Sequence, residues 1–396
     1  MKENWQYKKL GEVCDVINGL WTGKKEPLIN VAVIRNTNFS KDCKLKFDDV
    51  AYINVEEKQF NSRKLKFGDI IVEKSGGSEK QPVGRAVLFD VKYDNFSFSN
   101  FTATLRIKDI NVIDPFFLHK SLYFYYKNGE TFKMQSKTTG LHNLNMKDYL
   151  NLSIPLPSLK EQERIVAELD LLSGIIEKQK QQLKELDTLA QSIFYSMFGD
   201  PISNEKNWPL KKLGEICNIE RGGSPRPIEK YLTDDPNGLN WIKIGDATLG
   251  GMYINSTKQK IIHEGLKKTR FVHKGNFLLS NSMSFGKPYI LGIDGCIHDG
   301  WLVIQDFQNI FNKIYLYHYL NSQSVYENFK KMAVGGVVNN LNKDMVKKLP
   351  VSIPPFSLQN EFAVKIEKIE KQKETINKSI EETQKIFDYT MDKYFG

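Results

Sequence analysis

The chain has 396 residues, of which 40% are hydrophobic and 26% charged, and its formal net charge is +9; this composition is typical of a globular protein with two or three domains. The first residues are polar and no stretch approaches the ~20 apolar residues of a membrane-spanning helix, which argues against a secretory signal and a membrane anchor. The four cysteines, Cys14, Cys43, Cys217 and Cys296, are scattered, so we expect reduced thiols in a cytoplasmic protein and neither a disulfide framework nor a zinc site.

Residues 1–158 predict a mixed α/β domain with many short strands. The segments 70–72, 86–89 and 101–106 have the composition of strands, and the segment 115–134, rich in Leu, Phe and Tyr, predicts a helix that packs on their sheet. Polar and glycine-rich loops separate these elements.

The loop at 73–85 follows a strand and mixes glycine, serine, glutamine and basic residues. Glycine allows a ligand to approach the backbone, serine can bond phosphates, and Arg, Asn and Gln can pair with base edges. We therefore expect nucleic-acid contacts in this loop and earlier in the domain, although a simple turn is an equal alternative for any single loop. The predicted contact residues are Trp21, Lys24, Lys25, Arg35, Asn36, Asn38, Lys74, Ser75, Gly76, Gly77, Ser78, Lys80, Gln81 and Arg85.

Residues 159–199 predict one long helix with a coiled-coil seam. Ser158 is suited to the N-cap and Gly199 to the end of this helix, whose ~40 residues span roughly 60 Å. Apolar residues recur at alternating spacings of four and three, which is the heptad pattern of a coiled coil. The predicted seam residues are Ile165, Leu169, Leu172, Ile176, Leu183, Leu186 and Ile193.

Residues 200–356 predict a second mixed α/β domain. The segments 241–244, 277–279 and 301–304 have the composition of strands, and the apolar and aromatic segment 311–332 predicts a helix.

Two loops of the second domain, at 221–227 and 280–287, again mix glycine, serine and basic residues after a strand. We expect them to contact nucleic acid for the reasons given above, with the lysines contacting phosphates. A solvated surface residue is the alternative for each lysine taken alone. The predicted contact residues are Arg221, Gly222, Gly223, Ser224, Arg226, Lys243, Lys258, Lys260, Lys267, Lys268, Arg270, Ser280, Asn281, Ser282, Ser284 and Lys287.

Residues 357–396 predict a second long helix. Its heptad register is that of the first helix shifted by 197 positions, and Ser357 is suited to its N-cap. The predicted seam residues are Phe362, Ile366, Ile369, Ile376, Ile380 and Phe387.

The two halves of the chain repeat one another in the same order, which indicates a duplicated frame that carries two different inserts. Because the first helix leads into the second domain and the second helix leaves it, we expect the helices to run antiparallel. The two domains would then lie at opposite ends of a rod, related by a pseudo-twofold axis; plain helical packing inside one domain is the alternative. The repeated pairs are 5–14 and 208–217, 143–145 and 340–342, 154–159 and 353–358, and 198–199 and 395–396.

The positive charge lies in the two predicted domains and not in the helices. Residues 1–158 and 200–356 each carry a net charge of +6, whereas 159–199 and 357–396 carry −2 and −1. Two basic domains joined by nearly neutral helices suit a polyanion with two separated sites.

No pattern of catalytic residues is complete. The segment 19–24 is one residue too short for a phosphate-binding Walker A loop, and 354–356 lacks the Asp or Asn that precedes Pro-Pro-Phe in an adenine methyltransferase motif. The segment 56–58 faintly resembles a nuclease motif, but a charged loop explains it better, and the six histidines lack ligand spacing. We therefore expect a binding protein and not an enzyme.

Several motifs together resemble the specificity subunits of Type I restriction-modification systems, over essentially the whole chain. The second helix departs from the family's helix-entry motif, because Leu358-Gln359-Asn360-Glu361-Phe362 stands where Glu-Gln-x-Arg-Ile is expected. The motifs that match are Leu-Gly-Glu at 10–12 and 213–215, Pro-x-Leu-x-Glu-Gln-x-Arg-Ile at 157–165, Met-Phe-Gly-Asp-Pro at 197–201, Gly-Gly-Ser-Pro at 222–225, Trp-Ile-Lys-Ile-Gly-Asp at 241–246 and Ser-Asn at 280–281.

The resemblance implies that residues 1–158 and 200–356 are target-recognition domains, each recognising one half of an asymmetric bipartite site in double-stranded DNA. It implies that 159–199 and 357–396 are coiled-coil helices that set the spacer between the halves. The implied partners are two modification subunits, which bring S-adenosylmethionine and methylate adenine, and restriction subunits that use ATP and Mg²⁺. No cofactor is expected in this chain itself.

Two other classes of protein stay open at this point. One is a metal-dependent nuclease of the fused restriction type, and the other is a coiled-coil scaffold with basic end domains. The methylome of the host with and without this chain would distinguish them. Only if the chain is a specificity subunit would its loss remove adenine methylation at one bipartite motif.

Overall fold

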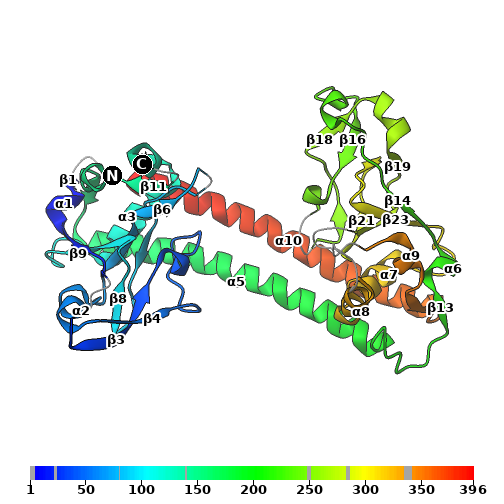
Figure 1. Ribbon diagram of the computed structural model, residues 1–396, viewed down its shortest axis with the longest axis horizontal. Helices are drawn as coiled ribbons and strands as arrows, with labels where there is room; N and C mark the ends of the chain where they lie inside the picture. Colours follow the sequence, from blue (N-terminus) through cyan, green and yellow to red (C-terminus); the bar gives the residue numbers. More distant parts are fainter. Residues whose placement is uncertain are drawn as a thin grey trace. The chain divides into compact units, whose positions relative to one another are not determined.

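The computed structural model describes residues 5–21, 25–79, 81–138, 141–247, 251–281, 286–333 and 341–396. The chain forms two compact units, one made of Met1–Gln179 with Ser379–Gly396 and the other of Lys180–Lys378. Two long helices, α5 (Leu159–Phe198) and α10 (Phe356–Phe395), each contribute one part to each unit; Figure 1 draws α5 in green and α10 in orange to red.

The first unit contains four small sheets among its described residues. Its helical segments are α1 (Leu10–Val13), η1 (Asn36–Asn38), α2 (Glu57–Arg63), α3 (Pro115–Lys127), η2 (Glu130–Met134), α4 (Met146–Leu150), the first part of α5 and the last part of α10. The strands, in sheet order, are β1 (Gln6–Lys9) with β12 (Ser153–Leu156); β2 (Cys14–Asn18), β9 (Thr102–Ile107), β5 (Ile70–Glu73) and β7 (Ala86–Leu88); β4 (Ala51–Glu56), β3 (Leu28–Ile34) and β8 (Phe96–Phe98); and β10 (Gln135–Thr138), β11 (Leu141–Leu144) and β6 (Ser75–Gly77).

The second unit repeats this arrangement with larger sheets. Its helical segments are the last part of α5, α6 (Leu213–Ile216), η3 (Ile228–Lys230), η4 (Ile244–Asp246), η5 (His263–Lys268), α7 (Lys313–Leu320), α8 (Gln323–Ala333), α9 (Lys343–Lys347) and the first part of α10. The strands, in sheet order, are β13 (Leu210–Lys212) with β24 (Pro350–Ser352); β14 (Asn218–Arg221), β23 (Trp301–Gln305), β20 (Phe277–Ser280), β21 (Pro288–Leu291) and β17 (Tyr253–Ile254); and β15 (Leu232–Thr233), β18 (Gln259–Ile261), β16 (Leu239–Ile242), β22 (Gly295–Ile297) and β19 (Arg270–Val272).

The central strand of each main sheet is buried on both faces, which explains its continuous apolar sequence. In β5, Ile70 and Val72 belong to the apolar cluster that includes α3 and α5, whereas Ile71 belongs to a second cluster on the opposite face. In β20, Leu278 likewise faces a different cluster from that of Phe277. The alternation arises because successive strand side chains point to opposite faces.

The predicted helices after the sheets are shorter than their apolar segments. The segment 115–134 is divided, because α3 ends before Gly129, which has a φ of 74° in the left-handed region that suits glycine. The segment 311–332 is likewise divided, into α7 and α8. A composition rich in Leu, Phe and Tyr predicts that such a segment is buried, but does not predict where the helix turns.

Parts of α5 and α10 pair antiparallel within each unit. In the first unit, Arg164 Nη2 donates to Tyr394 Oη at 2.9 Å, and fifteen residues later in α5, Gln179 Nε2 donates to Ser379 Oγ at 2.7 Å. Increasing residue numbers along α5 therefore correspond to decreasing numbers along α10. In the second unit Asp187 forms an ion pair with Lys373 at 2.8 Å and, further along α5, the ring of Phe198 lies 5.3 Å from that of Phe362, so the residue numbers again run in opposite directions. The predicted mixed fold with two long antiparallel helices is confirmed at this level.

The predicted seam residues are buried near both ends of the helices and half-buried between them. Toward the end of α5 the buried side chains are Phe194 and Phe198, whereas the predicted Ile193 is half-buried. The heptad pattern does not predict this shift, because α5 packs there against α7 as well as α10: the ring of Phe198 lies 4.7 Å from Tyr315 and 5.3 Å from Phe362. The fully buried seam residues are Ile165, Leu169, Phe362 and Ile366; Ile176, Ile369 and Phe387 are nearly so, and Leu172, Leu183, Leu186, Ile376 and Ile380 are half-buried.

A buried glutamine fixes the start of the first long helix. Gln162 is fully buried, and its Nε2 donates to the carbonyl oxygens of Val112 at 3.0 Å and Pro157 at 2.9 Å, while its Oε1 accepts from the backbone N–H of Asp114 at 2.8 Å. The side chain thus joins the helix start to the loop that precedes α3.

Gln359 makes the same three bonds in the second unit. Its Nε2 donates to Ile310 O at 3.1 Å and Pro354 O at 2.9 Å, and its Oε1 accepts from the backbone N–H of Asn312 at 2.8 Å. The departure of the second helix from the family's entry motif therefore leaves the function of the glutamine intact, and affects only its neighbours.

Replacing Gln162 by methionine is expected to destabilise the first unit by about 3 kcal/mol. The substitution keeps the side-chain length but leaves two carbonyl groups and one N–H group without partners, each of which costs about 1–3 kcal/mol when it stays buried. Chemical denaturation of the full chain measures the loss. Gln182→Met, at an exposed position of α5, is the control, and a loss for Gln162→Met no larger than that of the control would contradict the anchoring function.

A partly buried histidine crosslinks the first unit. His119 in α3 lies with Nε2 at 3.1 Å from the carbonyl oxygens of both Cys43 and Ala86, so a neutral ring donates one N–H to both. The pKa of His119 is lowered to about 4, mainly by burial and secondly by the positive charge of Lys120.

The stability of this unit is expected to fall as the pH is lowered from about 6.5 to about 4. Histidine in an unfolded chain has a pKa of about 6.5, so within this range the unfolded state binds the additional proton and folding must release it. His119→Gln, which keeps a donor, should reduce the slope, whereas His273→Gln at an exposed side chain should not. Equal slopes for the wild-type chain and His119→Gln, measured by denaturation at several pH values, would argue against this assignment.

Candidate nucleic-acid interface

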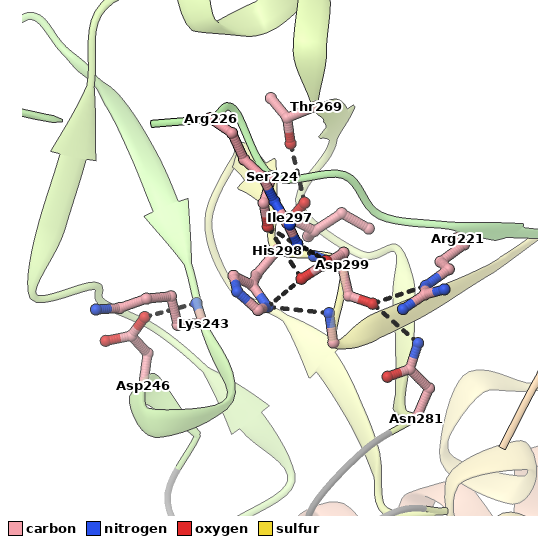
Figure 2. A network of polar contacts seen from close by, with 11 residues as sticks. Arg221, Ser224, Arg226, Lys243, Asp246, Thr269, Asn281, Ile297, His298 and Asp299 are labelled. Carbon is pink, nitrogen blue, oxygen red and sulfur yellow. Dashed lines mark hydrogen bonds and ion pairs between the residues drawn. The ribbon is translucent and has the colours of Figure 1, made fainter. Parts of the chain in front are cut away.

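The turn between β22 and β23 gathers several of the predicted contact residues of the second unit (Figure 2). The backbone oxygen of Asp299 accepts from Arg221 Nε at 2.9 Å and from Asn281 Nδ2 at 2.9 Å. Its carboxylate accepts from Ser224 Oγ at 3.0 Å and lies 3.5 Å from Arg226 Nη2. The loops at 221–227 and 280–287, separated by about sixty residues in sequence, are therefore joined through one turn.

Glycine allows the first of these loops to lie against the turn. A Cβ atom at Gly222 would lie 2.2 Å from the backbone oxygen of His298, which no real side chain tolerates. The Gly222 N–H donates to Trp301 O at 2.9 Å. At Gly223 a Cβ would lie 2.9 Å from the backbone oxygen of Lys268. The two predicted glycines thus have a structural function, and the polar groups come from the residues beside them.

Lys243 approaches the same region from the end of β16. Its backbone N–H donates to Asp246 Oδ2 at 2.8 Å, which closes η4, and its Nζ donates to Gln259 Oε1 at 2.6 Å. Figure 2 shows Lys243 and Asp246 beside His298.

The electrostatic environment of His298 reflects this gathering of cations. Its pKa lies below the usual value, mainly because of burial, and the positive charges of Lys243, Arg226 and Arg221 lower it further, while Asp299 opposes them. The N–H of the residue after Asp299 donates to Nδ1 of the ring at 3.0 Å, so the neutral ring carries its proton on Nε2. This face of the second unit is positive and rich in donors, which suits phosphates and base edges.

The first unit assembles a similar group of polar residues. Asn36 Nδ2 donates to Ser75 O at 2.6 Å, and Lys74 Nζ donates to Asn18 Oδ1 at 2.9 Å. Burial lowers the pKa of Lys74. Trp21 is 63% exposed, which leaves its ring free to contact a ligand. The structure therefore brings the predicted residues around Asn36 together with those around Lys74.

Other predicted contact residues have structural functions. Arg85 is 4% exposed and forms a bidentate ion pair with the buried Glu73, so the prediction that it contacts DNA is wrong on the ground of burial. Asn38 is buried, and its side chain caps η1 by accepting from the N–H of Arg35 at 2.9 Å. Gly77, Ser280 and Asn281 are also buried.

The remaining predicted side chains lie at the surface, several with a partner. Arg35 pairs with Asp49 at 3.1 Å, and Lys287 lies over the ring of Tyr326. Lys25, Ser78, Lys258, Lys267, Lys268 and Gly76 are exposed, and Gln81, Lys260 and Arg270 are half-buried. Lys24, Lys80, Ser282 and Ser284 lie outside the described residues.

Three residues of this site were not predicted from the sequence. His298 and Asp299 join the two loops of the second unit, and Asn143 accepts a hydrogen bond from Ser75 Oγ in the first. Strand pairing places all three beside the loops, and only Asn143 had a signal in the sequence, since it begins the repeated Asn-Leu-Asn segment.

The described residues contain no group of three His, Cys, Asp or Glu side chains that could hold a metal ion. In the same part of the chain, no helix combines the length and the hydropathy that a membrane crossing requires.

Comparisons with known proteins identify a single family. The sequence matches the family model described as Type I restriction modification DNA specificity domain twice, over residues 2–187 and 205–385. The type I restriction enzyme StySPI specificity subunit of Salmonella potsdam is 22% identical over 410 residues, which cover 96% of this chain and 85% of that protein. The MjaVIII specificity subunit of Methanocaldococcus jannaschii is 23% identical over 296 residues, which cover 67% of each.

A solved structure supports the fold. A chain from work on complex assembly and conformational transition of the type I R-M system superposes with a TM-score of 0.60 at 20% identity, covering 99% of this chain and 98% of that one. Neither the nuclease nor the scaffold alternative receives support from these relatives.

Proposed function

Because the chain belongs to the family of Type I restriction modification DNA specificity domains, we propose that its two units recognise the two halves of one bipartite DNA target. The chain is a DNA-recognition subunit and not the catalyst of methylation or cleavage. The finer assignment, of one half-site to each unit, is supported by the two family matches, one in each half of the chain.

One observation carries this proposal. Each unit gathers donors and cations around the turn that joins two of its sheets, and the residues at this place differ between the units. A shared frame with different polar groups is what recognition of two different base sequences requires, since phosphate contacts position a protein while base contacts specify the sequence. The net charge of +6 on each of the segments 1–158 and 200–356 supplies the attraction to phosphate.

The partners and cofactors follow from this function. We propose that two modification subunits bind the chain, bring S-adenosylmethionine and methylate adenine at the site that the chain selects. Restriction subunits that use ATP and Mg²⁺ would join this core, and the assembly would act in the cytoplasm. The chain itself would supply DNA recognition and no cofactor.

The methylome of the host tests this function. Deleting the gene for this chain is expected to remove adenine methylation at one bipartite motif, and restoring it to return that methylation. An unchanged methylome in a host that has the modification subunit would refute the proposal. If the purified chain then cleaved DNA in the presence of Mg²⁺, the nuclease alternative would replace it.

A further inference from the structure

One turn occupies the same place in both units. In the first unit it joins β8 to β9, and the N–H of Ser99 donates to Ile34 O at 2.9 Å, at the end of β3. In the second unit it joins β22 to β23, and the N–H of His298 donates to Ile242 O at 3.0 Å, at the end of β16. The strands before the turn are also equivalent, because β3 pairs in parallel with β8 as β16 does with β22.

The end of the central strand closes the other side of this turn in the same way. The N–H of Lys74, which follows β5, donates to Phe101 O at 2.9 Å. The N–H of Asn281, which follows β20, donates to Gly300 O at 2.9 Å. These bonds make Ser99-Asn100-Phe101 equivalent to His298-Asp299-Gly300, with Asn100 and Asp299 at the two centres.

An arginine and a glycine hold this frame identically in both units. Arg63 Nε donates to Asn18 O at 3.1 Å, and Arg270 Nε donates to Arg221 O at 3.1 Å. The glycine after each acceptor residue lies so close to the first residue of the turn that a Cβ would lie 1.9 Å from its oxygen in the first unit and 2.2 Å in the second. The frame is therefore the same, while the central residue of the turn is an amide in one unit and an acid in the other.

An acid at the centre of a positive face requires an explanation. The carboxylate of Asp299 is 29% exposed; it accepts from Ser224 Oγ and lies 3.5 Å from Arg226 Nη2, while the neutral ring of His298 places its unprotonated Nδ1 3.0 Å away. It would repel a phosphate, so contact with the DNA backbone does not account for it. A carboxylate is an acceptor only, and the base group that it suits in the major groove is the amino group of cytosine. Figure 2 shows Asp299 between the residues of the two loops.

Resting on the function proposed above, we propose that Asp299 and Asn100 are specificity-determining residues that contact one base pair in each half-site. Asp299 accepts from the exocyclic N4 amino group of a cytosine. Asn100, which is exposed and has both a donor and an acceptor, pairs with the N6 and N7 atoms of an adenine. The two units would then differ in sequence preference because equivalent turns carry different side chains.

Selection of DNA by the full chain bound to its modification subunit tests this proposal, with a library of randomised duplexes as the probe. Asp299→Asn is expected to lose the preference for cytosine at one position of one half-site by about tenfold or more, and to leave the other half-site unchanged. Asn100→Asp is expected to lose a preference for adenine in the other half-site. Asp344→Asn, which removes the same charge from an exposed position of α9, is the control and should alter neither.

The other outcomes are distinguishable. If Asp299→Asn weakened binding to all duplexes equally, Asp299 would only position Arg226 and Ser224, and the proposal would be overturned; an unchanged preference would overturn it as well. If Asp299→Asn failed to fold, Asn100→Asp would decide by the same criterion in the first unit. A wild-type complex that selected no bipartite sequence would instead refute the proposed function.

Discussion

Replacing Glu73 by alanine is expected to destabilise the first unit by about 3–5 kcal/mol, because it leaves the guanidinium group of Arg85 buried without its partner. The two side chains are only 1% and 4% exposed, and they form two hydrogen bonds of 2.8 and 3.0 Å. Arg85 also donates to the backbone oxygen of Phe39 at 3.1 Å, so the charge is held at one place and cannot turn to solvent.

Denaturation of the full chain measures this loss, and two controls interpret it. Asp49→Ala removes the partner of Arg35 in an exposed pair and should cost less than about 1 kcal/mol. The double variant Glu73→Leu with Arg85→Met replaces the pair by apolar side chains and should recover most of the stability. A loss for Glu73→Ala as small as that of Asp49→Ala would show that the pair is not the buried crosslink described above.

Exchanging residues 1–158 for the corresponding segment of another family member is expected to change one half of the methylated motif and leave the other half intact. The segment forms most of the first unit and has its own buried clusters. It also packs on the long helices, since the ring of Phe117 lies 5.3 Å from that of Phe395. A suitable donor segment therefore keeps an aromatic or large apolar residue at the position of Phe117.

The methylome of a host that carries the exchanged chain is the readout. Exchange of 200–356 is the reciprocal experiment and should change only the other half-site. Changes in both half-sites after either exchange would mean that the units do not recognise DNA independently, and the assignment of one half-site to each unit would fail.

The sequence predicts those parts of the fold that depend on periodic burial. The heptad seam predicts both long helices, because their apolar residues face one partner for most of their length. It misplaces the burial at Ile193, where α7 is an additional neighbour of α5. The end of α3 at Gly129 depends on a backbone conformation and not on burial, so a composition rich in apolar residues could not reveal it.

The site is predicted less completely, because it depends on contacts between strands distant in sequence. The loops around Lys74 and Arg221 have the composition of ligand-binding loops and do lie within the candidate site. Arg85 has the same chemistry in sequence, but Glu73, two residues before the serine-glycine pair at 75–76, gives no sign that it forms a buried ion pair with Arg85 until the strands are placed. Asp299 could not be predicted, since its importance arises from the groups that the fold brings to it.

The expectation that the long helices set the spacer stays a prediction. Inserting one heptad into both α5 and α10 preserves the seam, and is expected either to lengthen the spacer of the methylated motif or to abolish methylation. A motif with an unaltered spacer would show that the helices do not measure this distance.

The claim that each unit recognises one half of a bipartite target is tested most directly by the DNA sequences that the full chain, bound to its modification subunit, selects from randomised duplexes. We expect two separate blocks of specified base pairs, joined by a stretch of constant length in which every base is accepted. Selection of one continuous block, or of no sequence at all by a folded complex, would contradict the claim.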